Sequence, residues 1–105
     1  MYRYRQIAQV KYGHMSDYFA SLRKLLELAA ERGYQRPSVL MPVVGTVNEL
    51  VIEFKYDTYE AWERDRVRTA QDEQFRDAMV ELATHVVQGS ARDELFTTPP
   101  QLTDG

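Results

Sequence analysis

The sequence contains no cysteine among its 105 residues. Disulfide bridges, thiolate nucleophiles and thiolate metal ligands are therefore excluded, and the composition fits a reducing compartment. Histidine is scarce as well: there are two, His14 and His85, and they stand far apart, without the close spacing of common metal-ligand motifs. From this pattern we predict that the protein has no metal site.

Long apolar runs and a large excess of one charge are also missing. No apolar segment approaches the roughly 18 residues of a membrane span. The basic residues near the start are not followed by the apolar core of a secretory signal peptide. The net charge is −3, with both signs spread along the chain, so no basic patch suggests nucleic acid. We therefore expect a cytoplasmic protein that binds neither membranes nor nucleic acid.

Glycine is too sparse for the usual cofactor loops. The five glycines are scattered singly, whereas phosphate loops and dinucleotide fingerprints need several close together. No motif of an activated nucleophile is present either. We therefore predict that any activity of the protein requires no nucleotide cofactor, and, with no metal site expected, no cofactor at all.

The order of the hydrophobic periods predicts the fold. Alternation with period two indicates strands and a period near 3.6 indicates helices. The chain shows four segments of the first kind and two of the second: strands over residues 4–12, 38–44, 47–56 and 91–97, helices over 16–32 and 59–86. Their order is βαββαβ, the ferredoxin-like α+β motif. We expect one domain over residues 1–98 and a flexible tail over residues 99–105.

Local signals indicate where the helices begin and end. Ser16 is a good N-cap for the first helix, and Gly33 suits the left-handed conformation that ends it. Asp57 and Glu60 have the spacing of a capping box at the start of the second helical region. The apolar stripe of that region slips near Asp72, where we expect a break and a second cap.

The two faces of the expected sheet differ in polarity. Alternation places five residues of the first strand on a more apolar face, which we expect to meet the helices: Tyr4, Gln6, Ala8, Val10 and Tyr12. The opposite face carries basic residues of the first strand beside acidic residues of the third: Arg3, Arg5, Lys11, Glu49 and Glu53. Such a face is either solvated or buried between two subunits, where its charges must pair.

Four segments resemble the NIPSNAP-like proteins in their order and spacing. Residues 47–57 (VNELVIEFKYD) are similar to the third strand of that family. Residues 62–66 and 71–75 resemble its Arg-rich turn and the break that follows it, and residues 11–14 resemble the step before its first helix. The resemblance covers most of residues 4–98. It implies a subunit of the dimeric α+β barrel superfamily and a homodimer formed through the charged sheet face.

The superfamily to which the resemblance points contains cofactor-independent monooxygenases, polyketide cyclases and members without a known reaction. Fold alone therefore transfers no chemistry. This chain also departs from the pattern at three positions. Gln6 and Ala8 stand where the first strand often has Arg and Tyr, and Ile52 stands where the third strand often has His.

Aromatic residues on the helix-facing side predict a pocket for a hydrophobic or aromatic small molecule. We assign ligand binding to five residues: Tyr4, Phe54, Tyr56, Trp62 and Arg66. We assign catalytic roles to Gln6, Tyr12 and His14, with the tyrosine and the histidine moving protons. Gln6 and Arg66 would hold an oxyanion or a carboxylate. The alternative is a plain aromatic core whose hydroxyls reach the rim, with His14 as an exposed turn residue.

Two functions follow from this reading. The first is a small enzyme of secondary or aromatic metabolism, of monooxygenase, cyclase or isomerase type, that works without metal or nucleotide. The second is a non-catalytic module of the same fold that binds a ligand or a protein.

Overall fold

The chain folds into a four-stranded sheet and three helices, and the computed structural model describes residues 1–102. The elements follow in the order β1 (Tyr2–Gln9), α1 (Met15–Arg32), β2 (Ser38–Leu40), β3 (Glu49–Tyr56), α2 (Tyr59–Gln71), α3 (Glu73–Ala83), β4 (Arg92–Thr97) and the 3₁₀ helix η1 (Pro100–Leu102). The strand order is β2-β3-β1-β4, and every neighbouring pair is antiparallel. The predicted ferredoxin-like α+β fold is confirmed. The expected tail begins with η1, and its last residues, 103–105, lie outside the described residues.

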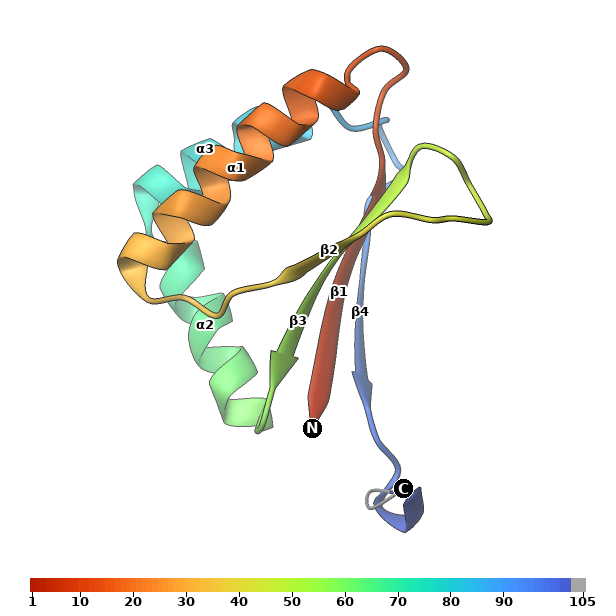
Figure 1. Cartoon of the computed structure of the whole chain (residues 1–105). Helices are drawn as coiled ribbons and strands as arrows, with labels where there is room; N and C mark the ends of the chain where they lie inside the picture. The colour runs from red at the N-terminus through yellow and green to blue at the C-terminus, as the bar shows by residue number, and fades with distance from the viewer. Residues whose placement is uncertain (103–105) are drawn as a thin grey trace.

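All three helices lie on one side of the sheet (Figure 1). Helices α1 and α3 pack beside each other, and α2 lies next to β3. The hydrophobic core fills the space between these helices and the sheet, and its buried members come from every layer: Val10, Tyr18, Leu22, Leu25, Leu50, Ile52 and Leu82. Within residues 1–102 the opposite sheet face carries no helix, and the loop between β2 and β3 extends on that side (Figure 1).

The strand register fixes which side chains share a face. Tyr4 pairs with Phe54 and Gln6 pairs with Ile52, so these residues face the helices, as the alternation of the sequence predicts. Arg5 pairs with Glu53 on the opposite face, and a 2.8 Å ion pair joins their side chains. The expected pairing of opposite charges between the first and third strands is present at this position.

The strands are shorter than predicted, and for β1 and β2 the physical reason is clear. β1 ends at Gln9 because the chain turns at residues 11–13, where the His14 backbone N–H bonds to the Lys11 carbonyl oxygen at 2.9 Å. Beyond β1 only Val10 pairs again, as an isolated bridge to Val86. β2 ends at Leu40, and residues 41–48 form a loop, since Pro42 has no N–H to donate to a ladder.

The first two expected helix caps are wrong by one or two residues. α1 begins at Met15 with His14 as N-cap, because the His14 carbonyl already accepts the N–H of Tyr18 at 2.8 Å. At α2 the N-cap is Thr58, not Asp57, because the Thr58 hydroxyl accepts the N–H of Ala61 at 3.1 Å.

The other two helix ends agree with the sequence. Gly33 ends α1 with φ of 72°, in the left-handed region that favours glycine. Asp72 separates α2 from α3 and caps the second segment by accepting the N–H of Phe75 at 3.0 Å. None of the helices in the described part of the chain combines the length and apolar character needed to cross a bilayer.

Candidate functional site

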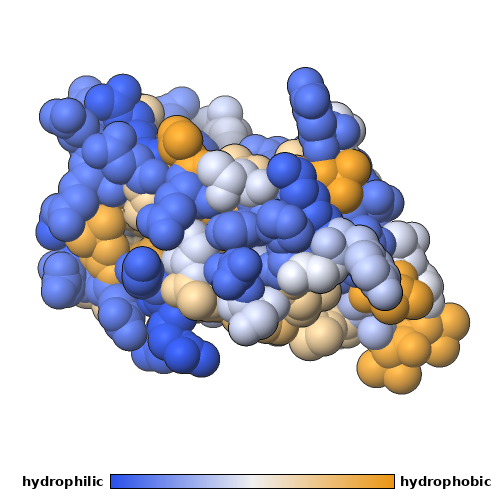
Figure 2. All heavy atoms as spheres, turned by 90° about the horizontal axis from the view of Figure 1, so that it is seen from above, coloured by the Kyte–Doolittle hydropathy of each residue, from blue (hydrophilic) through white to orange (hydrophobic). Residues whose placement is uncertain are grey.

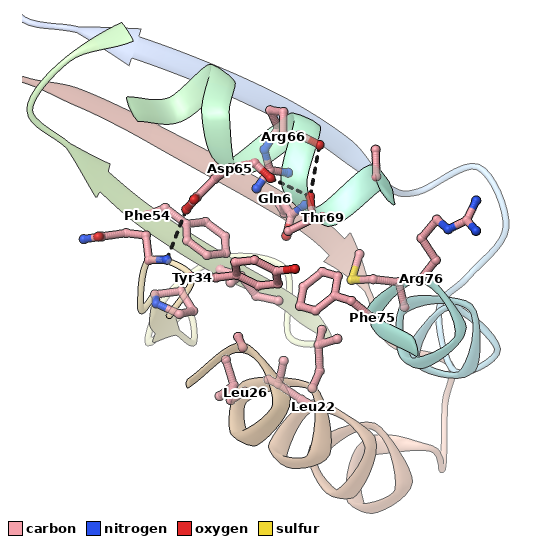
Figure 3. A pocket seen from close by; sticks show the side chains of 17 residues that line it. Gln6, Leu22, Leu26, Tyr34, Phe54, Asp65, Arg66, Thr69, Phe75 and Arg76 are labelled. Atoms are coloured by element: carbon pink, nitrogen blue, oxygen red, sulfur yellow. Dashed lines mark hydrogen bonds between the residues drawn. The ribbon is translucent and has the colours of Figure 1, made fainter. Parts of the chain in front are cut away.

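A cavity of ≈ 270 Å³ lies between the helix-facing side of the sheet and all three helices (Figure 3). Its walls are mainly apolar and come from each layer: Leu22 and Leu26 of α1, Ile52 and Phe54 of β3, and Phe75 and Met79 of α3. A few polar side chains reach it as well: Gln6, Tyr34, Asp65, Arg66 and Thr69. Its size is near the lower end of the range for small-molecule pockets, about 300–1,000 Å³, and its composition is typical of them.

Arg66 is one of the two arginines that line this cavity, the other being Arg76. Its guanidinium lies over the ring of Tyr4, 4.6 Å from the centroid, and 5.9 Å from the ring centroid of Phe54. One Nη donates weakly to the Tyr4 hydroxyl at 3.4 Å. The Nε is buried and has no hydrogen-bond partner within residues 1–102, where Arg66 also forms no ion pair. An unpaired buried donor costs about 1–3 kcal/mol, and more when it is charged, so Arg66 is poised to accept an anion.

Gln6 and Tyr4 form a small polar network beside Arg66. The Tyr4 hydroxyl donates to Asp93 Oδ2 at 2.6 Å and accepts from Gln6 Nε2 at 3.4 Å. Burial, and then the hydrogen bond to Asp93, raise the pKa of the Tyr4 phenol. Tyr4 therefore stays protonated near neutral pH, and its proton is already bound to a carboxylate. It is a poor general base and a good orienting group.

Asp65 is a buried carboxylate of α2 that serves the protein itself. It accepts the Tyr56 hydroxyl at 2.9 Å and the backbone N–H of Gln35 at 3.1 Å, and it lies 3.4 Å from an Nη of Arg68. Burial, and then the hydrogen bond to Asp65, raise the pKa of Tyr56. Tyr56 is therefore also held neutral. These contacts fix the strand, the helix and the segment after α1 around the cavity.

The cavity is closed on the α3 side by two rings. Tyr34 and Phe75 meet edge to face, with centroids 5.3 Å apart, and the Tyr34 hydroxyl donates to Asp72 Oδ2 at 2.6 Å. Figure 3 shows both rings between α1 and α2, and Arg76 reaching away from them. The hydrogen bond to Asp72 raises the pKa of Tyr34 most strongly.

The structure brings together six of the eight residues predicted for the site. Gln6, Phe54 and Arg66 line the cavity. Tyr4, Tyr56 and Trp62 form the layer behind it: the Tyr4 ring lies 5.8 Å from the Trp62 ring and 5.9 Å from the Phe54 ring, and Tyr56 stacks on Phe54. Trp62 is half-buried, and its buried Nε1 has no partner in the described chain.

Tyr12 and His14 do not join this set. Tyr12 is fully exposed, because β1 ends before it and the turn carries it away from the helix-facing side. His14 lies in the N-cap position of α1, where its Nδ1 is 3.1 Å from Nδ1 of His85. Neither residue lines the cavity. The two histidines, 71 positions apart in the sequence, thus lie side by side in the structure.

Sequence reasoning missed Asp65, Tyr34 and Thr69. Asp65 belongs to a run of charged residues that is typical of a solvated helix face. A signal was present, because Asp65 follows Trp62 by three positions and so lies on nearly the same side of the helix. Tyr34 follows the glycine that ends α1, and only the tertiary fold places it over α3.

The fold and its cavity define a ferredoxin-like α+β domain with a pocket between sheet and helices. No family model matches the sequence, and neither does any curated protein. Solved structures do match. An uncharacterized NIPSNAP domain protein from Burkholderia xenovorans superposes with a TM-score of 0.78, over 95% of this chain and 96% of its own, at 17% identity.

Two further structures extend the comparison. A NIPSNAP family protein from Agrobacterium tumefaciens has a TM-score of 0.73 over 94% of this chain and 93% of its own, at 14% identity. An antibiotic biosynthesis monooxygenase has a TM-score of 0.71 over 95% of this chain and 100% of its own, at 12% identity. The structural neighbours of this chain are thus NIPSNAP and monooxygenase folds, and the predicted resemblance is confirmed at the level of the fold.

Proposed function

We propose that the cavity binds a small, mainly apolar or aromatic anion, with Arg66 as its counter-ion and Gln6 as a neutral orienting donor. The observation that carries this proposal is Arg66 itself, which lines a mainly apolar cavity and whose buried Nε has no partner in residues 1–102. A carboxylate or an enolate oxygen would supply the missing acceptor in a charge-assisted bond.

The surroundings of Arg66 support an aromatic or aliphatic body for this ligand. Phe54, Tyr34 and Phe75 offer ring surface on several sides, and Leu22 and Leu26 complete the wall from α1 (Figure 3). An ion pair gains strength where water is excluded, provided that both charges find partners. The ligand therefore needs both parts, a charged head for Arg66 and an apolar body for the rest of the cavity.

A second candidate function is catalysis on such an anion without a cofactor. The neighbour named as a monooxygenase favours it, as does the convergence of Gln6 and Arg66, which suits an oxygen that gains charge during a reaction. No imidazole lines the cavity in the described chain, and Tyr4 and Tyr56 are held neutral. The residues that are present therefore support binding more directly than proton transfer.

We also propose that two copies pair through the uncovered sheet face. No helix of the described chain covers that face (Figure 1), yet Glu53 on it is only 6% exposed and the guanidinium of its partner Arg5 lies over the ring of Phe96, 5.0 Å from the centroid. Large apolar side chains lie exposed on the adjoining strand and loop: Leu40, Met41, Val43, Val44 and Val47. Figure 2 shows hydrophobic atoms projecting at this end of the molecule. A second sheet would cover both the charges and these side chains.

The ligand proposal is tested with matched pairs of charged and neutral compounds. Benzoate and 2-naphthoate should raise the Tm of the protein more than benzamide and 2-naphthamide, and Arg66→Met should weaken carboxylate binding at least about tenfold. Arg64→Met is the matched control, since Arg64 lies on the same helix and is exposed. Calorimetry measures both affinities. Equal binding of acids and amides, or a parent protein that binds none of them, would overturn the proposal.

A further inference from the structure

The only two histidines of the sequence meet at one end of the molecule. Figure 1 shows the start of α1 and the chain leaving α3 at this end. The two Nδ1 atoms of His14 and His85 are 3.1 Å apart, and their ring centroids are 5.4 Å apart. Asp17, in the first turn of α1, adds a carboxylate: one ligand atom from each of the three residues lies within 4.8 Å of the others.

We propose that His14, His85 and Asp17 form a binding site for a divalent transition-metal ion, with Zn²⁺ as the reference ion. Two nitrogen ligands at 2.0–2.1 Å from a tetrahedral Zn²⁺ are about 3.3–3.4 Å apart. The observed separation of 3.1 Å is close to that value. Two imidazoles and one carboxylate are also a common zinc donor set that leaves a fourth position open.

The backbone holds the two rings in place without help from a metal. His14 is the N-cap of α1, but its side chain makes no capping hydrogen bond, so the ring is left to face His85. The His85 carbonyl accepts the N–H of Lys11 at 2.8 Å, and the Gln9 carbonyl accepts the N–H of Val87 at 2.8 Å. These bonds join the segment before His14 to the segment that contains His85. The site is therefore preorganised at two of its three ligands.

Asp17 is the adjustable ligand. It follows His14 by three positions, so both side chains lie on one side of the first turn of α1. Its carboxylate is exposed, and a change of rotamer would bring an oxygen to coordination distance without disturbing the core. The negative charge would also offset part of the charge of the ion.

The alternative is that His14 and His85 share a proton and bind no metal ion. Two neutral imidazoles can form one N–H···N hydrogen bond, and the 3.1 Å separation is also suitable for it. A metal ion would replace that proton, since imidazole binds metals through an unprotonated nitrogen. The site does not border the cavity around Arg66, so its test is independent of the ligand proposal.

The experiment is a titration of the chelator-treated protein with ZnCl₂, followed by calorimetry and by NMR of the histidine ring nitrogens. We expect one ion per chain, movement of both Nδ1 signals, a rise in Tm, and weaker binding at low pH because protons compete. His14→Gln and His85→Gln should each weaken Zn²⁺ binding at least about tenfold, and Asp17→Asn should weaken it less. Asp77→Asn is the control, an exposed acidic residue of α3 that should leave the affinity unchanged.

Two results would overturn the proposed metal site. One is a parent protein whose histidine signals and Tm do not change with Zn²⁺ up to about 1 mM, which would leave a hydrogen-bonded pair only. The other is undiminished Zn²⁺ binding after both histidines are replaced, which would place the ion elsewhere. The NMR measurement needs no variant, so it decides the question even if a histidine substitution prevents folding.

Discussion

The guanidinium of Arg66 lies against aromatic faces and not against a carboxylate. The rings of Tyr4 and Phe54 present their negative π faces to it. Such contacts contribute about 0.5–2 kcal/mol each and leave the positive charge without a counter-ion. Lysine would not reproduce this arrangement, because only the planar guanidinium can stack on the rings and still offer several N–H donors at its edge.

Tyr56 allows a prediction on alkaline stability. Its pKa is raised in the folded protein, so the folded state keeps the phenol proton at a pH where the unfolded chain loses it. The free energy of unfolding should therefore fall as pH rises above about 10, the ordinary pKa of tyrosine. Tyr56→Phe should cost about 1–2 kcal/mol near neutral pH, because Asp65 loses a donor, and should make the alkaline fall less steep.

Urea unfolding at several pH values between about 7 and 11.5 measures both effects. Tyr12→Phe is the control, because that side chain is fully exposed. Identical pH slopes for the parent and Tyr56→Phe would contradict the assignment. Tyr4, Tyr18 and Tyr34 have raised pKa values too, so Tyr56→Phe should reduce the slope without abolishing it.

Among the secondary elements, the break between α2 and α3 ties together three parts of the chain. Asp72 accepts the N–H of Phe75 at 3.0 Å, the Tyr34 hydroxyl at 2.6 Å and the Arg32 Nε at 3.1 Å. It thus anchors the end of α1 and the ring of Tyr34 to the start of α3. The pKa of Asp72 is lowered, first by the hydrogen bond from Tyr34 and then by that from Phe75.

Replacing Asp72 should loosen this junction. A lowered pKa stabilises the folded state above the ordinary aspartate pKa, and this stabilisation is lost as pH falls through the folded value. Asp72→Ala should therefore lower the Tm at neutral pH and reduce the difference in Tm between neutral and acid solution. Asp72→Asn should retain part of the cap. Thermal unfolding followed by circular dichroism measures this, with exposed Asp77→Ala as control; equal losses in both variants would contradict the anchoring role.

The order and the faces of the elements could be predicted from the sequence, but only some of their ends could. Alternation in β1 and β3 correctly placed Gln6 and Phe54 on the helix side, because strand periodicity is a local property. The end of β1 depends instead on the turn at residues 11–13 and on the bridge from Val10 to Val86, which joins distant parts of the chain.

In the candidate site too, features set by local periodicity could be predicted, and features set by contacts between distant segments could not. Gln6 and Arg66 were predicted because strand and helix periods place them on inward faces. The burial of Asp65 was not predicted, because it depends on contacts with Tyr56 and with the backbone of Gln35, which belong to other parts of the fold. The meeting of His14 with His85 also requires the packing of α1 beside α3, and no spacing in the sequence encodes it.

At the scale of the whole molecule, the uncovered sheet face is the main asymmetry. Two of its residues, Ile7 and Glu53, are already 5% and 6% exposed in a single chain, shielded by neighbours on the same face. The remaining surface is a mixture of ion pairs and apolar side chains, including Arg92 with Glu49 at 3.8 Å. Such a surface suits a partner with the same pattern, as two-fold pairing provides.

Glu53→Arg tests the proposed pairing. It breaks the ion pair with Arg5 and places like charges on adjacent strands, so we expect dimers to dissociate. Light scattering should give twice the 12.3 kDa of one chain for the parent and close to one chain for the variant. The double variant Arg5→Glu with Glu53→Arg should restore pairing, and Glu63→Arg on α2 is the exposed control. A parent protein that scatters as a single chain would refute the dimer.

The pairing of β1 with β4 also sets the order in which the protein can be completed during synthesis. Tyr2 lies opposite Thr97 and Ile7 opposite Arg92, so one edge of β1 remains unpaired until β4, far later in the sequence, has also left the ribosome. During that interval the edge is open to strands of other nascent chains. Asp93, which holds the Tyr4 hydroxyl beside Arg66, arrives with the same strand. The polar network of Tyr4, Gln6 and Asp93 beside Arg66 is therefore complete only after β4 has joined the sheet.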